Sequence, residues 1–178
     1  MSLQRRTFLK MAVAGCSVLG LASARRAAAA DGARIISFVH THTGETLTAP
    51  YFLDGVYQPD CLESVNRLLR DFRTGDVHVI DPTLLDILFD LSVRADRQAP
   101  FEVISGYRSP ATNEMLRYSS DGVAQHSMHL EGRAIDIRLQ GFDTRKLAEH
   151  ARALSRGGVG LYPASDFVHV DTGRVRYW

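Results

Sequence analysis

The chain has 178 residues, of which 45% are hydrophobic and 23% charged, so it has enough apolar side chains for a packed core. Its formal net charge of +1 gives no reason to expect nucleic acid binding. We expect an export signal over residues 1–30 and a single domain over residues 31–178, a length typical of one domain.

The N-terminal segment has the order of features found in a twin-arginine export signal. Arg5-Arg6 precede an apolar stretch over residues 11–24, and three alanines at residues 28–30 supply the small side chains of a cleavage site. No other apolar run approaches the roughly 20 residues that a membrane-spanning helix needs. We therefore expect a periplasmic domain without a transmembrane segment.

Two cysteines bear on this expectation. Cys16 ends the sequence Val13-Ala14-Gly15-Cys16, which resembles a lipoprotein cleavage box, so the alternative is a lipoprotein tethered to a membrane through Cys16. Cys61 has no partner in the mature domain, which excludes an internal disulfide there despite an oxidising destination. We expect its thiol to be buried or partly buried.

The first elements after the signal are strands. Residues 34–40 and 45–52 read as two strands, and Asp54-Gly55 is a favourable turn into a short third one. His40 and His42 alternate where the first strand ends, a spacing that can chelate a metal ion. We prefer the simpler interpretation, a strand end followed by an ordinary turn.

Two helices follow. Apolar residues recur at helical spacing over residues 62–72, and Asp81-Pro82 supplies an N-cap and a first-turn proline for a second helix that reaches residue 91. Both apolar stripes are core positions without chemistry. The polar connection over residues 71–76 has no role that the sequence assigns.

The next strand leads to a candidate functional arginine. A buried strand covers residues 101–105, and Ser109-Pro110 begins a helix that extends to about Tyr118. Arg108 therefore lies at a strand-to-helix corner, where its side chain can project into a cleft. A permanently charged, planar guanidinium suits carboxylate and oxyanion groups, whereas bracing the loop through carbonyl contacts is the alternative. Tyr107 is a candidate for substrate contact.

The segment over residues 127–136 carries the strongest chemical signal. His129 is followed by a glycine that allows a turn, Asp136 then lies in an alternating strand, and His169 follows 33 residues later. Two imidazoles and one carboxylate are a usual ligand set for catalytic zinc, because three protein ligands leave the fourth tetrahedral position open. These residues predict a zinc hydrolase. A polar turn followed by a half-buried strand is the simpler alternative.

The C-terminal part reads as a helix followed by strands. Asp143 is a candidate N-cap for a helix through residue 154, which Gly157-Gly158 would end. The strands that follow are expected over residues 159–162, 167–171 and 175–178.

Two carboxylates lie near His169 in the sequence. Strict strand alternation puts Asp171 on the same face as His169 and Asp166 on the opposite face. Asp166 can therefore accept a proton in the site only if the turn over residues 163–165 reorients it.

Three segments together resemble a known family. Residues 105–109, residues 127–136 in the pattern S-x-H-x(2)-G-x-A-x-D, and residues 167–171 (Phe-Val-His-Val-Asp) are similar to the zinc-dependent peptidoglycan peptidases related to D-Ala-D-Ala carboxypeptidases. The likeness is closest to the murein endopeptidase K branch and covers residues 36–178. It implies one zinc ion per chain, with three ligands: His129, Asp136 and His169.

The resemblance also implies roles for residues around the metal. Asp166 is implied as general base and acid, since several relatives carry an acidic residue at this offset from the last ligand. Asp171 is the rival, and otherwise orients a ligand histidine. Arg108 is implied to bind the peptide and to stabilise the developing oxyanion. Ser127, like Tyr107, is a candidate for substrate contact.

His126 departs from the branch, which usually has Asn at this position. Two consequences are open: an extra polar residue in the wall of the cleft, or a change in metal selectivity. A histidine beside a metal loop more often packs behind the ligands or is exposed.

The implied activity is hydrolysis of amide bonds in the peptide stems of peptidoglycan, with cross-links as the expected substrate and wall growth or remodelling as the process. Alternatives are D,D- or L,D-carboxypeptidase action on stem peptides, and a zinc-containing module that binds wall peptides without cutting them. The implied fold is α+β, a small antiparallel sheet that carries the zinc site with helices over one side, as in the hedgehog signalling domain and the D-Ala-D-Ala metallopeptidases. No feature of the sequence indicates an oligomeric state.

Overall fold

The computed structural model describes residues 32–119 and 124–178, so the predicted export signal and Cys16 lie outside the described residues. The strands are β1 (Arg34–His40), β2 (Thr46–Leu53), β3 (Val56–Tyr57), β4 (Phe101–Ser105), β5 (Ala134–Leu139), β6 (Gly158–Tyr162), β7 (Phe167–Asp171) and β8 (Arg176–Tyr177). The helices are α2 (Pro59–Leu68), α3 (Pro82–Arg94), α4 (Pro110–Ser119) and α5 (Thr144–Leu154), with a short 3₁₀ helix, η1 (Met128–Glu131). None of these helices is long and apolar enough to cross a membrane.

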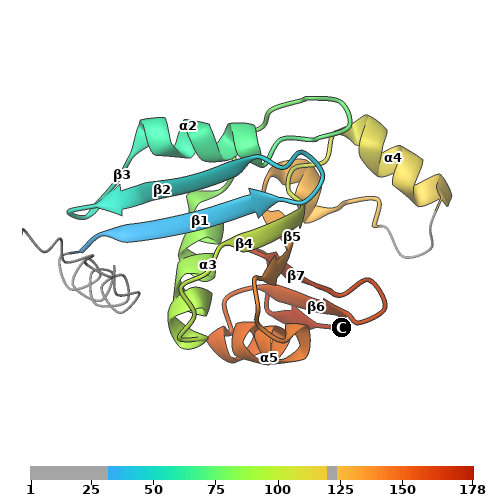
Figure 1. The fold of residues 1–178 in the computed structure, drawn as a ribbon. Helices are drawn as coiled ribbons and strands as arrows, with labels where there is room; N and C mark the ends of the chain where they lie inside the picture. The colour runs from blue at the N-terminus through green and yellow to red at the C-terminus, as the bar shows by residue number, and fades with distance from the viewer. Residues whose placement is uncertain (1–31, 120–123) are drawn as a thin grey trace, which may run out of the picture.

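All eight strands form one sheet, in the order β3-β2-β1-β4-β5-β7-β6-β8 (Figure 1). Most neighbours are antiparallel, but β1 pairs with β4 and β6 pairs with β8 in parallel. The predicted α+β class is confirmed. The prediction of a small antiparallel sheet was wrong, because the sheet has eight strands and includes parallel pairs. The physical reason is the crossover through α2 and α3, which returns the chain to lie parallel beside β1.

Helix ends follow local capping chemistry in most places. The side chain of Asp81 accepts a hydrogen bond from the backbone N–H of Thr83, and that of Asp143 accepts one from Lys146, which confirms both predicted N-caps. The helix predicted over residues 62–72 ends earlier, at Leu68. The last helix ends at Leu154 with Ser155 in the left-handed conformation at φ 52°, before the glycines predicted to end it.

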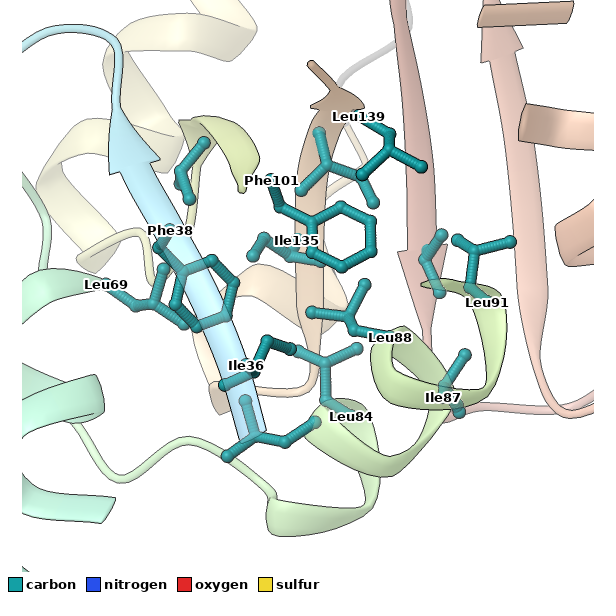
Figure 2. Close-up of a cluster of buried hydrophobic side chains, with 14 of the residues drawn as sticks. Ile36, Phe38, Leu69, Leu84, Ile87, Leu88, Leu91, Phe101, Ile135 and Leu139 are labelled. Carbon is teal, nitrogen blue, oxygen red and sulfur yellow. The ribbon is translucent and has the colours of Figure 1, made fainter. Parts of the chain in front are cut away.

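The core lies between the sheet and two helices. α3 packs against β1 and against α5, and α5 packs against β5, β6 and β7. Figure 2 shows Phe38, Phe101 and Ile135 from three adjacent strands gathered around Leu84 and Leu88 of α3, and all five side chains are buried. Cys61 packs at the edge of this core as a partly buried free thiol, as predicted.

The alternation of β5 positions the functional side chains. Ile135, Ile137 and Leu139 belong to the core, so the residues between them face the other side of the sheet. Asp136 is the first of these, and it lies opposite His169 in the register of β5 and β7. The core therefore fixes which face of the sheet carries the predicted ligands.

Candidate metal centre

His129, Asp136 and His169 converge on one point. The ring atom Nε2 of His129 lies 3.2 Å from Nδ1 of His169 and 3.3 Å from Oδ1 of Asp136, and these last two atoms are 2.9 Å apart. All three side chains are buried. A tetrahedral zinc ion with bonds of about 2.0–2.2 Å holds its ligand atoms roughly 3.3–3.6 Å apart, so this triangle is close to the size that zinc needs.

A tight turn brings His129 to the two strands. Ser127 caps η1 by accepting a hydrogen bond from the backbone N–H of His129, and Gly132 ends it at φ 66°. A Cβ atom at residue 132 would lie 2.1 Å from the backbone oxygen of Val79, so only glycine fits there. The glycine noted in the sequence is therefore required both by its conformation and by its neighbour.

In His129 and His169, the ring nitrogen that points away from the triangle is hydrogen-bonded to a protein oxygen, which leaves the other ring nitrogen to face the triangle. Nδ1 of His129 lies 2.7 Å from the carbonyl oxygen of Gly106, and Nε2 of His169 lies 3.0 Å from Oδ2 of Asp171. Because these two oxygens can only accept, each of those ring nitrogens carries the proton. With the inner nitrogen of His169 deprotonated, the two inner nitrogens and the carboxylate oxygen of Asp136 face one another as acceptors, an arrangement that a shared cation would satisfy.

The electrostatics of the triangle also favour a positive charge. Burial lowers the pKa of His129. Burial opposes ionisation of Asp136, but contacts with both histidines outweigh it and hold the carboxyl pKa well below its ordinary value. Burial likewise lowers the pKa of His169, but the carboxylates of Asp136 and Asp171 outweigh it and leave that pKa raised. A divalent cation would supply the charge that these groups stabilise.

Arg108 holds the ligand carboxylate from outside the triangle. Its Nη2 donates to Oδ2 of Asp136 over 2.6 Å, and its Nε donates to Oγ of Ser105 over 3.0 Å. Asp136 therefore uses one oxygen for the arginine and the other for the triangle. Within the described part of the chain Nη1 of Arg108 makes no hydrogen bond, although Arg108 lines the cavity.

The corner that carries Arg108 is fixed by a buried carboxylate. Oδ2 of Asp71 accepts hydrogen bonds from both the backbone N–H and the hydroxyl of Ser109, at 2.8 and 2.7 Å. Burial raises the pKa of Asp71, but hydrogen bonds from Thr112, Ser109 and the backbone outweigh it and lower the pKa to about 2. Asp71 belongs to the polar connection to which the sequence assigned no role.

A cavity of about 680 Å³ opens beside the triangle. The ligands, Arg108 and the predicted residues His126 and Ser127 line it. The aromatic part of its wall consists of Tyr162, Phe167 and Trp178.

Asp166 and Tyr107 do not reach this site, contrary to prediction. Asp166 lies at φ 51° in the turn before β7, and its exposed carboxylate accepts a hydrogen bond from Thr144 and lies beside Arg138. The turn thus directs Asp166 toward α5 and away from the cavity. Tyr107 stacks on His78, with ring centroids 4.7 Å apart, and does not line the cavity.

The positions of Asp171 and His40 agree with the sequence analysis, which placed Asp171 beside His169 and treated His40 as the end of a strand. Asp171 is on the face of His169 and contacts it, as strand alternation predicts. His40 is buried and His42 stacks on Phe72. Among the described residues, the triangle is the one group of three or more potential ligands within reach of a shared metal ion.

Sequence reasoning missed Arg176 and Trp178. Both come from the C-terminal strand and line the cavity. The available signal was the run of glycines at residues 157, 158 and 160, because glycine in a strand often marks a place where another group approaches closely.

Comparisons with known proteins agree with the site. Residues 28–178 match a protein family described as peptidoglycan L,D-endopeptidase MepK. The chain is 44% identical over 146 residues to the probable peptidoglycan L,D-endopeptidase MepK of Haemophilus influenzae, an alignment that covers 82% of this chain and 78% of that protein. It is 40% identical over 145 residues to the peptidoglycan L,D-endopeptidase MepK of Escherichia coli K12, covering 82% and 80%. No solved structure gives a significant match.

Proposed function

This chain belongs to the family described as peptidoglycan L,D-endopeptidase MepK, and from that premise we propose that it is a zinc-dependent endopeptidase that cuts cross-links between peptidoglycan stems. The names of its relatives point to the L,D class of amide bond. The observation that carries the metal part of the proposal is the buried triangle of acceptor atoms in His129, Asp136 and His169.

The donor set fits zinc, and the chain contributes the geometry. Zinc bound there supplies Lewis-acid polarisation of the scissile carbonyl and a water nucleophile near neutral pH. Gly106 and Asp171 hold the outer protons of His129 and His169, so the inner nitrogens are the ones that would bind zinc. Asp136 contributes the single negative charge among the ligands. His129, Asp136 and His169 would hold the ion, and the cavity that they line would admit the reacting groups.

Arg108 is suited to two tasks at once. Its Nη2 fixes Asp136, while its Nη1 is available for the carbonyl oxygen of a peptide in the cavity. A preorganised donor aimed at the oxygen that gains charge lowers the barrier to acyl transfer. This keeps the role that the family resemblance implies for Arg108.

Proton transfer needs a side chain that reaches the cavity. Asp171 is fully buried and already bonded to His169, to Arg176 and to two backbone N–H groups, so it serves as an orienting partner. Apart from the ligands and arginines, the described wall offers His126 and Tyr162 as side chains that can carry a proton. We place the proton-transfer step with one of these two in preference to Asp166.

Mass spectrometry of muropeptides tests the function. The purified protein would be incubated with intact sacculi in three forms: zinc-loaded, chelator-treated, and chelator-treated with zinc restored. We expect cross-linked dimers to disappear in the first and third samples only, with new termini at an L,D bond. Loss of terminal residues without loss of dimers would identify a carboxypeptidase, and an unchanged profile with zinc bound would identify a wall-peptide binding module.

Export by the twin-arginine route to the periplasm is proposed from residues 1–30 alone. Replacing Arg5-Arg6 by Lys-Lys tests it, because the paired arginines are the part of the signal that this route reads. We expect the precursor to accumulate inside the cell. Cys16→Ser is the matched test of the lipoprotein alternative, and we expect it to leave the location unchanged.

A further inference from the structure

A chain of hydrogen bonds connects the C-terminal strand to the metal centre. Arg176 lies on β8, opposite Gly158 of β6. Its Nη2 donates to Oδ2 of Asp171 over 2.6 Å, and its Nη1 donates to Oδ1 of Asp171 over 3.1 Å. Oδ2 of Asp171 in turn accepts from Nε2 of His169, at 3.0 Å. A ligand histidine is thus linked to Arg176 through one carboxylate.

The carboxylate of Asp171 depends on Arg176 for its counter-charge. Its side chain has 0% exposure, so water cannot replace a missing partner. Its remaining hydrogen bonds come from the backbone N–H groups of Gly158 and Gly173, at 3.1 and 2.8 Å. Among the described residues, Arg176 is the one arginine or lysine paired with Asp171. Removing one member of a buried ion pair leaves an uncompensated charge, which is strongly unfavourable.

The backbone of β6 leaves space for this arrangement. A Cβ atom on Gly158 would lie 2.4 Å from Oδ2 of Asp171 and 2.5 Å from Nη1 of Arg176. A Cβ atom on Gly160 would lie 2.5 Å from the indole of Trp178. Two glycines at alternate positions of β6 therefore make room for the side chains of Arg176 on β8 and of Trp178, which follows β8.

Trp178 supports the same histidine by a second contact. Its ring centroid lies 5.3 Å from that of His169, and the Nε1 proton of the indole is donated to the hydroxyl of Tyr162 over 2.8 Å. The guanidinium of Arg176 lies 5.0 Å from the centroid of the same indole. The C-terminal segment thus approaches His169 in two ways: Arg176 acts through Asp171, and Trp178 packs on the ring directly.

We propose that Arg176 is a positioning residue of the metal centre, which fixes Asp171 and through it the tautomer and ring orientation of His169. The inference rests on the proposed metal site. Arg176 does not contact the ligand atoms itself. A guanidinium that donates to both oxygens of a carboxylate fixes its orientation as well as its charge, and hydrogen-bond partners of ligand histidines commonly control metal affinity.

Zinc affinity, measured by competition with a chromophoric chelator, tests the proposal. We expect Arg176→Met to bind zinc roughly 10- to 100-fold more weakly than the unmodified protein. Arg174→Met is the matched control, since Arg174 is exposed on the same segment and contributes its backbone carbonyl, not its guanidinium, to the described hydrogen bonds. Its zinc affinity should not change. Equal affinity in a folded Arg176→Met protein would overturn the proposal, whereas an unmodified protein that binds no zinc would contradict the metal site itself.

A second variant decides the matter if Arg176→Met does not fold. Arg176→Lys keeps a positive charge beside Asp171 but cannot donate to both oxygens in parallel. We expect its zinc affinity to be measurably reduced, by less than in Arg176→Met. With cobalt(II) in place of zinc, its visible absorption bands should also shift, because these bands report ligand geometry. Affinity and bands identical to those of the unmodified protein would overturn the proposal.

Discussion

Asp136 and His169 lie directly opposite each other on the antiparallel strands β5 and β7, with Oδ1 and Nδ1 2.9 Å apart. Cross-strand partners on one face of a sheet lie close together whatever their separation in sequence. The hydrophobic core on the other face fixes that register, because a slip of either strand by one residue would turn its polar side chain into the core. The ligand pair is therefore held by the same packing that stabilises the sheet.

His169→Ala removes one corner of the triangle. We expect the variant to lose zinc binding at stoichiometric concentrations and to lose turnover by at least about a thousandfold, because the metal supplies both the nucleophile and the polarisation. Zinc content by mass spectrometry and cleavage of cross-linked muropeptides measure the two losses. His42→Ala is the matched control, since His42 lies outside the triangle, and it should keep both properties.

Arg108→Met separates substrate activation from metal binding. We expect turnover to fall by roughly 10²- to 10³-fold, because the donor to the developing oxyanion is lost. Zinc binding should weaken much less, since the three ligands remain. Arg108→Lys should recover turnover only in part, because an ammonium cannot reach Asp136 and Ser105 as a planar fork does. Arg145→Met, on the exposed side of α5, is the control; a loss of turnover there would undermine the assignment.

Asp166→Asn should leave the turnover of the enzyme nearly unchanged. Its carboxylate is 66% exposed and lies beside Thr144 and Arg138, outside the cavity. We expect turnover within about a factor of two of the unmodified protein.

Asp171→Asn should instead weaken zinc binding by roughly 10- to 100-fold, because it removes the charge that orients His169. Steady-state kinetics and zinc titration distinguish the two, and a large loss of turnover in Asp166→Asn with zinc still bound would restore Asp166 as the base.

Asp71→Asn tests how much the buried carboxylate of Asp71, which holds the strand-to-helix corner beside Arg108, stabilises the fold. The folded pKa of Asp71, about 2, lies below the ordinary aspartate value of 3.8, so ionised Asp71 stabilises the fold at neutral pH. At 1.36 kcal/mol per pKa unit this contribution is about 2 kcal/mol. It is fully present above about pH 4 and is lost as the pH falls toward about 2.

Urea unfolding of the metal-free protein at several pH values measures this contribution. We expect the unfolding free energy of Asp71→Asn to be lower than that of the unmodified protein at pH 7, with a difference that shrinks between about pH 4 and pH 2. Glu114→Gln, an exposed substitution on α4, should show no such pH dependence. A difference that stays constant down to pH 2 would contradict the depressed pKa.

Local patterns predicted the helices and strands better than the contacts between distant segments. Strand alternation placed Asp171 correctly beside His169, and the caps at Asp81 and Asp143 depend only on neighbouring residues. The direction of Asp166 depends on Thr144 and on Arg138, which no local rule brings together.

The parallel strand pairs were missed for the same physical reason. β1 meets β4 after a crossover through two helices, and β8 meets β6 after β7 has intervened. Such pairings are set by how whole elements pack, so Arg176 and Trp178 entered the site without a signal of their own. Only the glycines of β6, which leave space for them, mark the contact in the sequence.

We propose that one zinc ion, bound by His129, Asp136 and His169, makes this protein a peptidoglycan endopeptidase. The most direct test is to titrate zinc into the metal-free protein and to measure the rate at which a purified cross-linked muropeptide is cleaved. We expect the cleavage rate to rise linearly with added zinc, to stop rising at one zinc per chain, and to stay at background in His169→Ala. Cleavage by the metal-free protein at the same rate, or a zinc-saturated protein that leaves the cross-link intact, would contradict it.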